Sequence, residues 1–469
     1  MDEFGAFMAF NVAFEGLLGR TGPLADSDMQ AFTTFILDVT YPPNPIRALD
    51  DSLSSDQQAG LDFFMQEISL LNILTCNACH SLAPEVGFFG SNGLMSAEGE
   101  TQEFKIPHLR NMYQKVGMFG MPPSDGIIPG GAAFMGDQIR GFGFIHDGSV
   151  DTLFRFHSTP FFTFPGGAPQ VSQVESFMHA FDSNLKPVVG QQITLTDTNS
   201  DVAIPRVDLL FGQANQVPGP VPPPRSENTD LIVKGILNGE VRGWFYDLNQ
   251  QKFISDRQAD TPLDRSQLQI IATDQPGQPL TFTAVPLGSG NRIGINRDED
   301  SFLDGDDNCP AIANPAQTDT DSDGAGNPCD VDDDNDGLTD VFESTIGTNT
   351  LLVDSDSDGL TDFEEVAFDG DSSQYTIGQD LNPLSNDTDG DGLLDAVDPI
   401  PLTVNLGDGD MNADGSLNAG DLLITTRIVL GLLTATETHL AHGDLYPALA
   451  PDGKINVQDL ILLQKLLLP

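Results

Sequence analysis

Basic residues are scarce in this sequence of 469 residues: 20 Lys and Arg stand against 70 Asp and Glu, and the formal net charge is −50. Such an acidic chain repels phosphates, so its composition argues against nucleic acid and against an anionic membrane surface as partners. No apolar run approaches the ~18 residues of a membrane-spanning helix, and we expect no transmembrane segment. The first ten residues, MDEFGAFMAF, hold two acids and no base, whereas a secretory signal begins with positive charge.

Changes in composition divide the chain, which at this length is expected to form roughly two to four domains. A capping pattern at Ser54 and Gln57 predicts one helix, and residues 170–184 predict a second, amphipathic one. The strand-like runs LIVKG, VRGWFYD, QKFIS, LQIIATD and LTFTAVP predict a small β module, in which we find no chemistry. The expected segments are the tail of a truncated upstream region (1–50), a mainly α domain (51–212), a Pro-rich linker (213–228), the small β module (229–295), an acidic stalk with little regular structure (296–403) and an α-helical pair (404–469).

Cysteine is also scarce, with four in the chain, and two of them lie in the stretch LTCNACHSL. Cys76, Cys79 and His80 form the Cys-x-x-Cys-His sequence that covalent attachment of haem c requires. Two thiols one helical turn apart can add across the two vinyl groups of the porphyrin. His80 is then placed under the macrocycle as an iron ligand. The sequence therefore predicts one covalent haem c.

Three alternatives for this cysteine pair stay open. A structural zinc site needs a further Cys/His pair at metal-ligand spacing, and the sequence has none. A thioredoxin-like dithiol follows a strand in a βαβ unit, whereas a helix is expected before this motif. A chance occurrence is the third, because the motif is short.

Two later segments, FKIPHLRNMYQKVGMFG and FGFIHDGSVDTLFRF, resemble the bacterial di-haem cytochrome c peroxidase family over residues 55–185. The residues that match the family's two turns are Pro107, Leu109, Arg110, Asn111, His146, Asp147, Gly148 and Leu153. The resemblance implies a mainly α c-type cytochrome domain. This chain departs from the family in having one attachment motif instead of two. It also has His157 and no methionine in residues 154–163, where the family carries a methionine ligand.

The sixth iron ligand is therefore not fixed by the sequence. Met118 is the first choice, because a thioether in an apolar loop suits an electron-transfer haem and raises its potential. Met121, His157 and His146 are alternatives, and Met118 could instead fill a Phe-rich core. Arg110 is expected to pair either with a haem propionate or in a surface ion pair.

Haem c attachment and disulfides both belong outside the reducing cytosol. Because the chain opens without an export signal, we expect it to be a fragment of a periplasmic or extracellular protein whose start lies upstream.

Residues 296–398 hold 30 Asp and Glu and a single base, Arg297, so this run either stays disordered or is neutralised by cations. Four windows in it fit the twelve-residue calcium loop, with a glycine at position 6 that permits the sharp turn. The window 296–307 is a weaker member, with Ser301 at position 6. The expected ligands are Asp319, Asp321, Asp323 and Asp330 in the first loop (319–330), Asp332, Asp334, Asp336, Asp340 and Glu343 in the second (332–343), Asp354, Asp356, Asp358, Asp362 and Glu365 in the third (354–365), and Asp387, Asp389, Asp391, Asp395 and Asp398 in the fourth (387–398).

Calcium is favoured over Mg²⁺, which prefers few carboxylates and many waters, and a disordered acidic tail would show no register. The segment DGDDNCPAIANPAQTDTDSDGAGNPCD also resembles the thrombospondin type 3 repeat, through Asp-Asn-Cys-Pro and Asn-Pro-x-Gln. The resemblance implies a disulfide between Cys309 and Cys329, and several calcium ions in place of a hydrophobic core.

Two loop–helix units end the chain, and together they resemble a type I dockerin over residues 404–469. The expected ligands are Asp410, Asn412, Asp414, Ser416 and Asp421 in the first loop, and Asp452 and Asp459 in the second. The resemblance implies an EF-hand-like helical pair that docks onto a cohesin-like module. The second loop spans sixteen residues instead of twelve, so its site is either bulged or lost. A calcium-stabilised helix pair that interacts within its own chain is the alternative.

Together these patterns predict a multidomain protein with a c-type cytochrome domain, a small β module, a calcium-loop stalk and a dockerin-like pair. The predicted function is extracytoplasmic electron transfer with a redox partner protein or a small oxidant, and no catalytic residue is assigned. The alternatives are a cytochrome c peroxidase-like oxidoreductase that uses a second haem upstream, and a calcium-dependent surface scaffold or adhesion protein.

Overall fold

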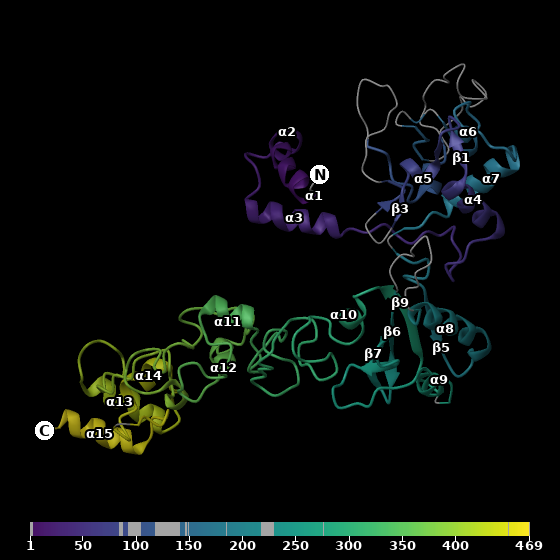
Figure 1. Cartoon of the computed structure of the whole chain (residues 1–469). Coiled ribbons are helices and arrows are strands. Elements are labelled where there is room, and N and C mark those ends of the chain that lie inside the picture. The colour runs from purple at the N-terminus through teal and green to yellow at the C-terminus, as the bar shows by residue number, and fades with distance from the viewer. Residues whose placement is uncertain are drawn as a thin grey trace. The chain divides into compact units, whose positions relative to one another are not determined.

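The computed structural model describes residues 3–83, 88–91, 105–117, 141–145, 148, 150–183, 185–216, 229–274, 276–448 and 450–468. The chain forms two compact units, Met1–Asp306 and Asp307–Pro469. Figure 1 shows helices together with small sheets in a multidomain chain, which confirms the coarse architecture that the sequence predicts. None of the helices in the described ranges is long and apolar enough to cross a membrane.

Aromatic contacts hold the helices at the start of the first unit together. These elements are α1 (Glu3–Met8), the 3₁₀ helix η1 (Ala9–Val12), α2 (Ala13–Leu18) and α3 (Asp26–Asp38). The ring of Phe32 in α3 lies 5.4 Å from that of Phe7 and 6.1 Å from that of Phe14, centroid to centroid. Edge-to-face pairs at these distances stabilise helix packing.

A helical core follows, built on α4 (Ser55–Gln66) and α7 (Ala168–His179), which pack against each other. The predicted capping box is confirmed, because the side chains of Ser54 and Gln57 each accept the other's backbone N–H. The two helices approach closely at Gly60, where a Cβ would lie 2.1 Å from a backbone carbonyl oxygen of α7.

Short elements connect these helices and carry the Cys-x-x-Cys-His motif. They are β1 (Ile68–Leu70), β2 (Leu74–Thr75), α5 (Cys76–Cys79), β3 (Leu82–Ala83), β4 (Phe88–Phe89), the 3₁₀ helix η3 (Met112–Lys115) and α6 (Leu153–His157). β1 pairs with β2, and β3 with β4, both antiparallel. The core beneath them is rich in phenylalanine, and Cys76 packs against it.

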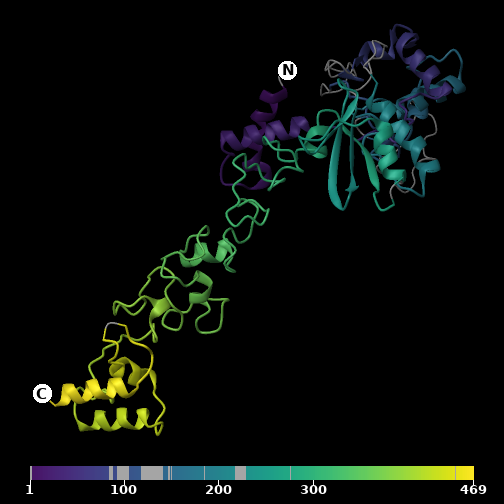
Figure 2. The same cartoon turned by 90° about the horizontal axis from the view of Figure 1, so that it is seen from below.

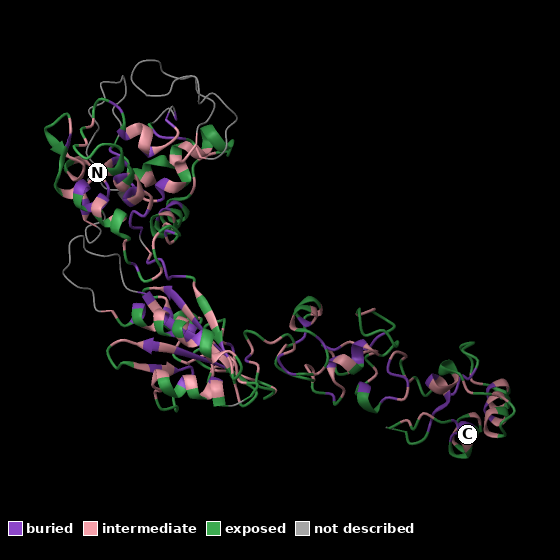
Figure 3. Cartoon of the chain, turned by 90° about the vertical axis from the view of Figure 1, so that its right-hand side faces the viewer, coloured by how far each residue is buried: buried purple, intermediate pink, exposed green. Residues whose placement is uncertain are grey.

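The β module is a five-stranded antiparallel sheet in the order β5-β9-β6-β7-β8. Its elements are β5 (Gln192–Leu195), α8 (Ser200–Ala214), β6 (Thr229–Leu237), β7 (Glu240–Asp247), β8 (Lys252–Ser255), α9 (Arg265–Asp274), β9 (Leu280–Pro286) and α10 (Gly290–Gly294). Figure 3 shows buried residues along these strands. Val233 of β6 lies opposite Trp244 of β7 and Phe282 of β9, and all three side chains are buried in one core.

The module differs from the sequence prediction in two respects. The run LQIIATD is helical, not a strand, because Leu268, Ile271 and Ala272 recur at helical spacing and face one core. In addition, β5 pairs with β9, and Val207 and Leu210 of α8 enter the same core. The sheet therefore draws on residues from both sides of the segment 213–228, of which residues 217–228 lie outside the described ranges.

The second unit has little regular structure before its C-terminal helices, as the sequence predicts. Its elements are α11 (Asp340–Ile346), α12 (Asp362–Val366), the 3₁₀ helix η5 (Asp395–Val397), α13 (Ala419–Val429), α14 (Glu437–Gly443) and α15 (Val457–Leu467). α13 and α15 are the two expected apolar helices, and they pack side by side (Figure 2). Met411, Leu445, Ile455 and Leu463 form the buried core of this helical end.

Candidate cofactor and metal sites

The Cys-x-x-Cys-His motif lies on a single helical turn. The Thr75 side chain caps α5 by accepting the Ala78 N–H at 3.2 Å, and the His80 N–H donates to the Cys76 carbonyl at 2.9 Å. Residues three apart lie on one face of a helix, so Cys76 and Cys79 share a face, and His80 follows directly. Both cysteines are free and half-buried. This is the residue arrangement that two thioether bonds and one iron ligand require.

The His80 ring is oriented by a backbone carbonyl that the sequence does not reveal. Its Nδ1 lies 2.8 Å from the Gly90 carbonyl oxygen, so Nδ1 carries the proton and donates it. The lone pair is then left on Nε2, which is how ligating histidines are commonly prepared. Burial lowers the pKa of His80, and the carbonyls of Gly90 and Pro107 offset part of that effect. The neutral imidazole, the form that binds metal, is thereby favoured.

The surroundings of Cys76 shift the pKa of its thiol in the opposite direction from that of a redox-active dithiol. Burial raises the pKa of Cys76 to about 11. A reactive thioredoxin-like cysteine needs a lowered pKa, so that the thiolate is populated near neutral pH. The surroundings of Cys76 therefore disfavour a redox-dithiol role for the motif.

Of the candidate sixth ligands, only His157 falls in the part of the chain that the structure describes. Met118, Met121 and His146 lie outside the described residues. His157 ends α6 and is 4% exposed. Burial, together with a smaller effect of repulsion from a charged His80, lowers the pKa of His157 to about 3.

Arg110 lies against aromatic rings next to this site. Its guanidinium carbon is 4.2 Å from the ring centroid of Tyr41 and 4.6 Å from that of Phe89, the residue before Gly90. Burial lowers the pKa of Arg110. The Tyr41 hydroxyl meets Nε2 of His108 at 2.7 Å, and the Arg110 backbone N–H donates to Nδ1 of His108 at 3.2 Å, so Arg110 belongs to an aromatic and imidazole cluster.

The four acidic loops share one pattern of backbone hydrogen bonds. In each loop the glycine N–H at position 6 donates to the carboxylate at position 1, and the N–H at position 5 donates to the carboxylate at position 3. The glycine bonds are Gly324 to Asp319 (3.2 Å), Gly337 to Asp332 (3.1 Å), Gly359 to Asp354 (3.0 Å) and Gly392 to Asp387 (2.8 Å). The position 5 bonds are Asp323 to Asp321 (3.1 Å), Asp336 to Asp334 (3.2 Å), Asp358 to Asp356 (3.1 Å) and Asp391 to Asp389 (3.1 Å).

These bonds gather the carboxylates at positions 1, 3 and 5 in each loop. In four clusters, one oxygen from each of three acids lies within 4.8 Å of the others, which is an arrangement that could hold a metal ion. The glycines at position 6 have φ between +99° and +107°, where side chains are rarely tolerated. The clusters are Asp319, Asp321 and Asp323; Asp332, Asp334 and Asp336; Asp354, Asp356 and Asp358; and Asp387, Asp389 and Asp391.

The acids at position 9 close the loops. Asp340, Asp362 and Asp395 accept the N–H of position 2 at 3.0, 2.9 and 2.9 Å, respectively. The second oxygen of Asp362 accepts from Ser355, and that of Asp395 from Thr388. Both oxygens of these two acids are therefore used within the loop.

The acids at position 12 carry buried oxygens without counter-charge. Glu343 and Glu365 are both fully buried. Oε2 of Glu343 and both oxygens of Glu365 have no hydrogen-bond partner within the described residues. Burial and neighbouring carboxylates raise the pKa of Glu343 to about 8 and that of Glu365 to about 9. A bound cation would offset this unfavourable burial, and so the donor set fits calcium. In the other two loops, position 12 is held by Asp398, which is 9% exposed, and by the half-buried Asp330.

A disulfide joins Cys309 and Cys329, as the thrombospondin-like resemblance implies. Their Cα atoms are 5.7 Å apart, and Cys309 is fully buried. The bridge ties the first acidic loop to the chain before it. Disulfides of this kind are typical of proteins in oxidising compartments.

The two C-terminal loops are alike at both ends. Asp410 accepts the Gly415 N–H at 2.6 Å, and Asp444 accepts the Gly453 N–H at 2.7 Å. The matching bond identifies Asp444 as position 1 of the longer loop, and the extra residues lie between it and Asp452. The sixteen-residue loop predicted from the sequence begins at Asp444, and this bond makes Asp444 a candidate ligand in addition to Asp452 and Asp459.

The remaining predicted ligands in these loops are placed as follows. In the first loop, the Asn412 side chain accepts the Asp414 N–H, and the Ser416 carbonyl accepts a hydrogen bond from the Asn418 side-chain amide. In the second loop, the Asp452 side chain accepts the Lys454 N–H. Asp421 and Asp459 complete capping boxes with Asn418 and Asn456, respectively. One oxygen of Asp421 and one of Asp444 are buried with no partner in the described chain. Both loops therefore present a buried carboxylate oxygen for a cation.

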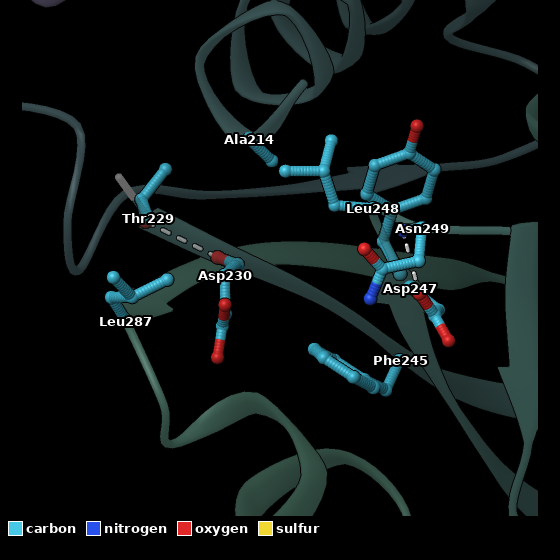
Figure 4. A pocket seen from close by; sticks show the side chains of 9 residues that line it. Ala214, Thr229, Asp230, Phe245, Asp247, Leu248, Asn249 and Leu287 are labelled. Atoms are coloured by element: carbon cyan, nitrogen blue, oxygen red, sulfur yellow. Dashed lines mark hydrogen bonds between the residues drawn. The ribbon is translucent and has the colours of Figure 1, made fainter. Parts of the chain in front are cut away.

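The β module contains a small hollow between β6, β7 and the end of α8, shown in Figure 4. Asp230 is one of the polar residues that line it, together with Thr229, Tyr246, Asp247 and Asn249. The carboxylate of Asp230 already accepts the N–H groups of Gly288 and Gly290 at 2.9 and 2.8 Å. Burial raises the pKa of Asp230. Asp230 is thus engaged in holding the start of α10, and the hollow suggests no chemistry.

Comparisons with protein-family models and with curated proteins give no match to this chain. Any functional conclusion therefore depends on the geometry of its own residues.

Proposed function

We propose that this chain is an extracytoplasmic c-type cytochrome that transfers electrons. In this proposal one haem is bonded to Cys76 and Cys79 and ligated by His80, and a calcium-loaded second unit ends in a dockerin-like pair. The observation that carries the proposal is the helical turn of α5 followed by His80, whose Nδ1 is engaged by the Gly90 carbonyl. The disulfide at Cys309 favours the extracytoplasmic location.

The residues of the site have separable tasks in this mechanism. Cys76 and Cys79 would hold the haem through thioether bonds, and His80 would present Nε2 to the iron. The bound haem would supply a one-electron iron couple. The hydrogen bond to Gly90 fixes the ring plane of His80 and increases its basicity. The phenylalanine-rich core beside Cys76 excludes water from one side of the site.

The experiment is expression of the full chain behind an export signal in a host that matures c-type cytochromes. A pyridine haemochrome assay is expected to give one haem per chain, and the purified protein is expected to exchange electrons with small redox reagents. The matched control is the double variant Cys76→Ala/Cys79→Ala, which should lose the haem. Rapid peroxide turnover by the haem-loaded protein would identify the alternative, a peroxidase-like enzyme.

For the second unit we infer calcium binding in the four acidic loops and in the two C-terminal loops. Support comes from the repeated clusters of carboxylates and from the buried, unpartnered oxygens at Glu343 and Glu365. Calcium titration of the chelated full chain, followed by calorimetry, is expected to show several sites. Unchanged protease resistance of residues 296–398 in excess chelator would contradict this inference.

The C-terminal pair is proposed to dock onto a cohesin-like module. The two capped helices and the matching loop bonds at Asp410 and Asp444 support this role. Binding of the full chain to a panel of immobilised cohesins in calcium tests it. No binding by a folded, calcium-loaded chain would favour the alternative in which the pair interacts within its own chain.

A further inference from the structure

The imidazole of His157 is buried, and one of its ring nitrogens lacks a hydrogen-bond partner within the described residues. The residue is 4% exposed, and its Nδ1 has no partner among the residues that the structure describes. Phe156, Phe162 and Phe164 surround its ring, with centroids 5.4, 5.4 and 5.7 Å away. Buried polar groups are nearly always paired, so an unpaired ring nitrogen in an aromatic cage points to a partner beyond the side chains that the structure describes.

Backbone hydrogen bonds bring the chain after His157 alongside the chain that leads into Cys76. The Leu71 N–H donates to the Phe161 carbonyl, and the Thr163 N–H donates to the Ser69 carbonyl, both at 2.9 Å. A β-bridge pairs Leu70 with Phe162 between these two bonds. The residues that follow α6 are thus anchored to β1, a few residues before the haem-attachment motif.

Phe156 and Phe164, whose rings contact the His157 ring, pack against the same hydrophobic core as Cys76 of the haem-attachment motif. His157 and the haem-attachment motif therefore border one apolar core. An iron ion bound there would satisfy the unpaired nitrogen of His157, because neutral imidazole is a common iron ligand.

We propose that His157 is the sixth ligand of the haem iron, opposite His80. This inference rests on the proposed haem function and replaces Met118 as the first choice. It makes the site a bis-histidine haem, whose reduction potential is lower than that of a His/Met haem because a thioether ligand raises the potential.

The test compares axial-ligand spectra and midpoint potentials of the haem-loaded full chain. Wild type is expected to be low-spin and to lack the near-infrared charge-transfer band of a thioether-ligated iron. His157→Met should gain that band and a higher midpoint potential. His157→Gly should become high-spin and recover a low-spin spectrum when free imidazole is added.

Two controls are matched to these variants. Met118→Ala should leave the spectrum unchanged. His179→Gln should do the same; His179 is only partly buried, unlike His157, and its Nε2 also lacks a partner in the described residues. A thioether band in wild type that disappears in Met118→Ala would overturn the inference, as would an unaltered low-spin spectrum in His157→Gly without imidazole.

Absence of covalent haem from wild type would instead refute the proposed function, so the two failures are distinguishable. If His157→Gly does not fold, the wild-type spectrum and His157→Met still decide the question.

Discussion

The carboxylate of Asp336 accepts the backbone N–H of Phe363 at 3.1 Å, although the two residues belong to successive acidic loops. The relationship recurs along the second unit: Asp358 accepts from Ala396 at 3.0 Å, and Asp391 accepts from Asn405 at 2.8 Å. Each acid occupies position 5 of its own loop. One oxygen of this residue therefore serves the loop, while the other holds the element that follows.

Replacing Asp336 with Asn should weaken two loops at once. The amide carries less charge for the cation, and it is a poorer acceptor for the Phe363 N–H at the start of α12. Calcium titration by calorimetry should show weaker binding at more than one site. Asp323→Asn is the matched control, because Asp323 occupies the same position in the first loop and bonds only to nearby N–H groups in the described contacts. Loss confined to a single site in Asp336→Asn would show that the loops are independent.

Gly337→Ala should destabilise the calcium-loaded protein more than Gly324→Ala. Both glycines have φ above +100°, a strained conformation that costs on the order of 1–3 kcal/mol for other residues. At Gly337 a Cβ would also lie 3.2 Å from the Phe363 ring, whereas nothing lies within 4 Å at Gly324. Denaturant unfolding in calcium measures both losses of free energy. Equal losses would mean that the Phe363 ring moves away at no cost.

Without calcium, the second unit should become less stable as pH rises. Glu343 and Glu365 have folded-state pKa values of about 8 and about 9, against 4.5 in the unfolded chain. The folded state therefore binds more protons between these limits, and stability is lost as pH rises from about 4.5 through 8 to 9. Thermal unfolding of the chelated protein across this range measures the slope. Glu365→Gln should flatten it, and a midpoint that rises with pH would contradict the assignment.

Opening the disulfide should destabilise the first acidic loop. Cys309 and Cys329 are 20 residues apart, and closing a loop of this size is worth about 3 kcal/mol in the chain-entropy account. The variant Cys309→Ser/Cys329→Ser should show faster proteolysis between residues 309 and 330 and an unchanged haem spectrum. Protease resistance equal to wild type would mean that calcium alone orders this loop.

The sequence predicted those features that depend only on residues close to one another in the chain. The capping box at Ser54, the α5 motif and the register of the acidic loops all rest on fixed spacings of a few residues. They could be identified without knowledge of the tertiary structure. The hydrogen bonds from Phe363 to Asp336 and from His80 to Gly90 join residues that are farther apart in the sequence, and no spacing pattern predicts them.

The differences between the sequence predictions and the structure have separate causes. Leu268, Ile271 and Ala272 sit in a short apolar run, and the strand prediction overlooked the helical spacing that turns all three towards one core. Strand β5 lies far from its partner β9 in sequence, so its membership of the sheet could not be predicted from local pattern. Asp444 begins the sixteen-residue loop predicted from the sequence, but it was not counted among the ligands, and the Gly453 bond supports that role.

The intact mass of the exported protein tests the central claim most directly. Wild type is expected to show the mass of the polypeptide plus one haem, after denaturation, and digestion should locate the added mass on the peptide that contains Cys76 and Cys79. The variant Cys76→Ala/Cys79→Ala should show the mass of the bare chain. An unmodified mass for wild type, from a host that loads other c-type cytochromes, would contradict the account.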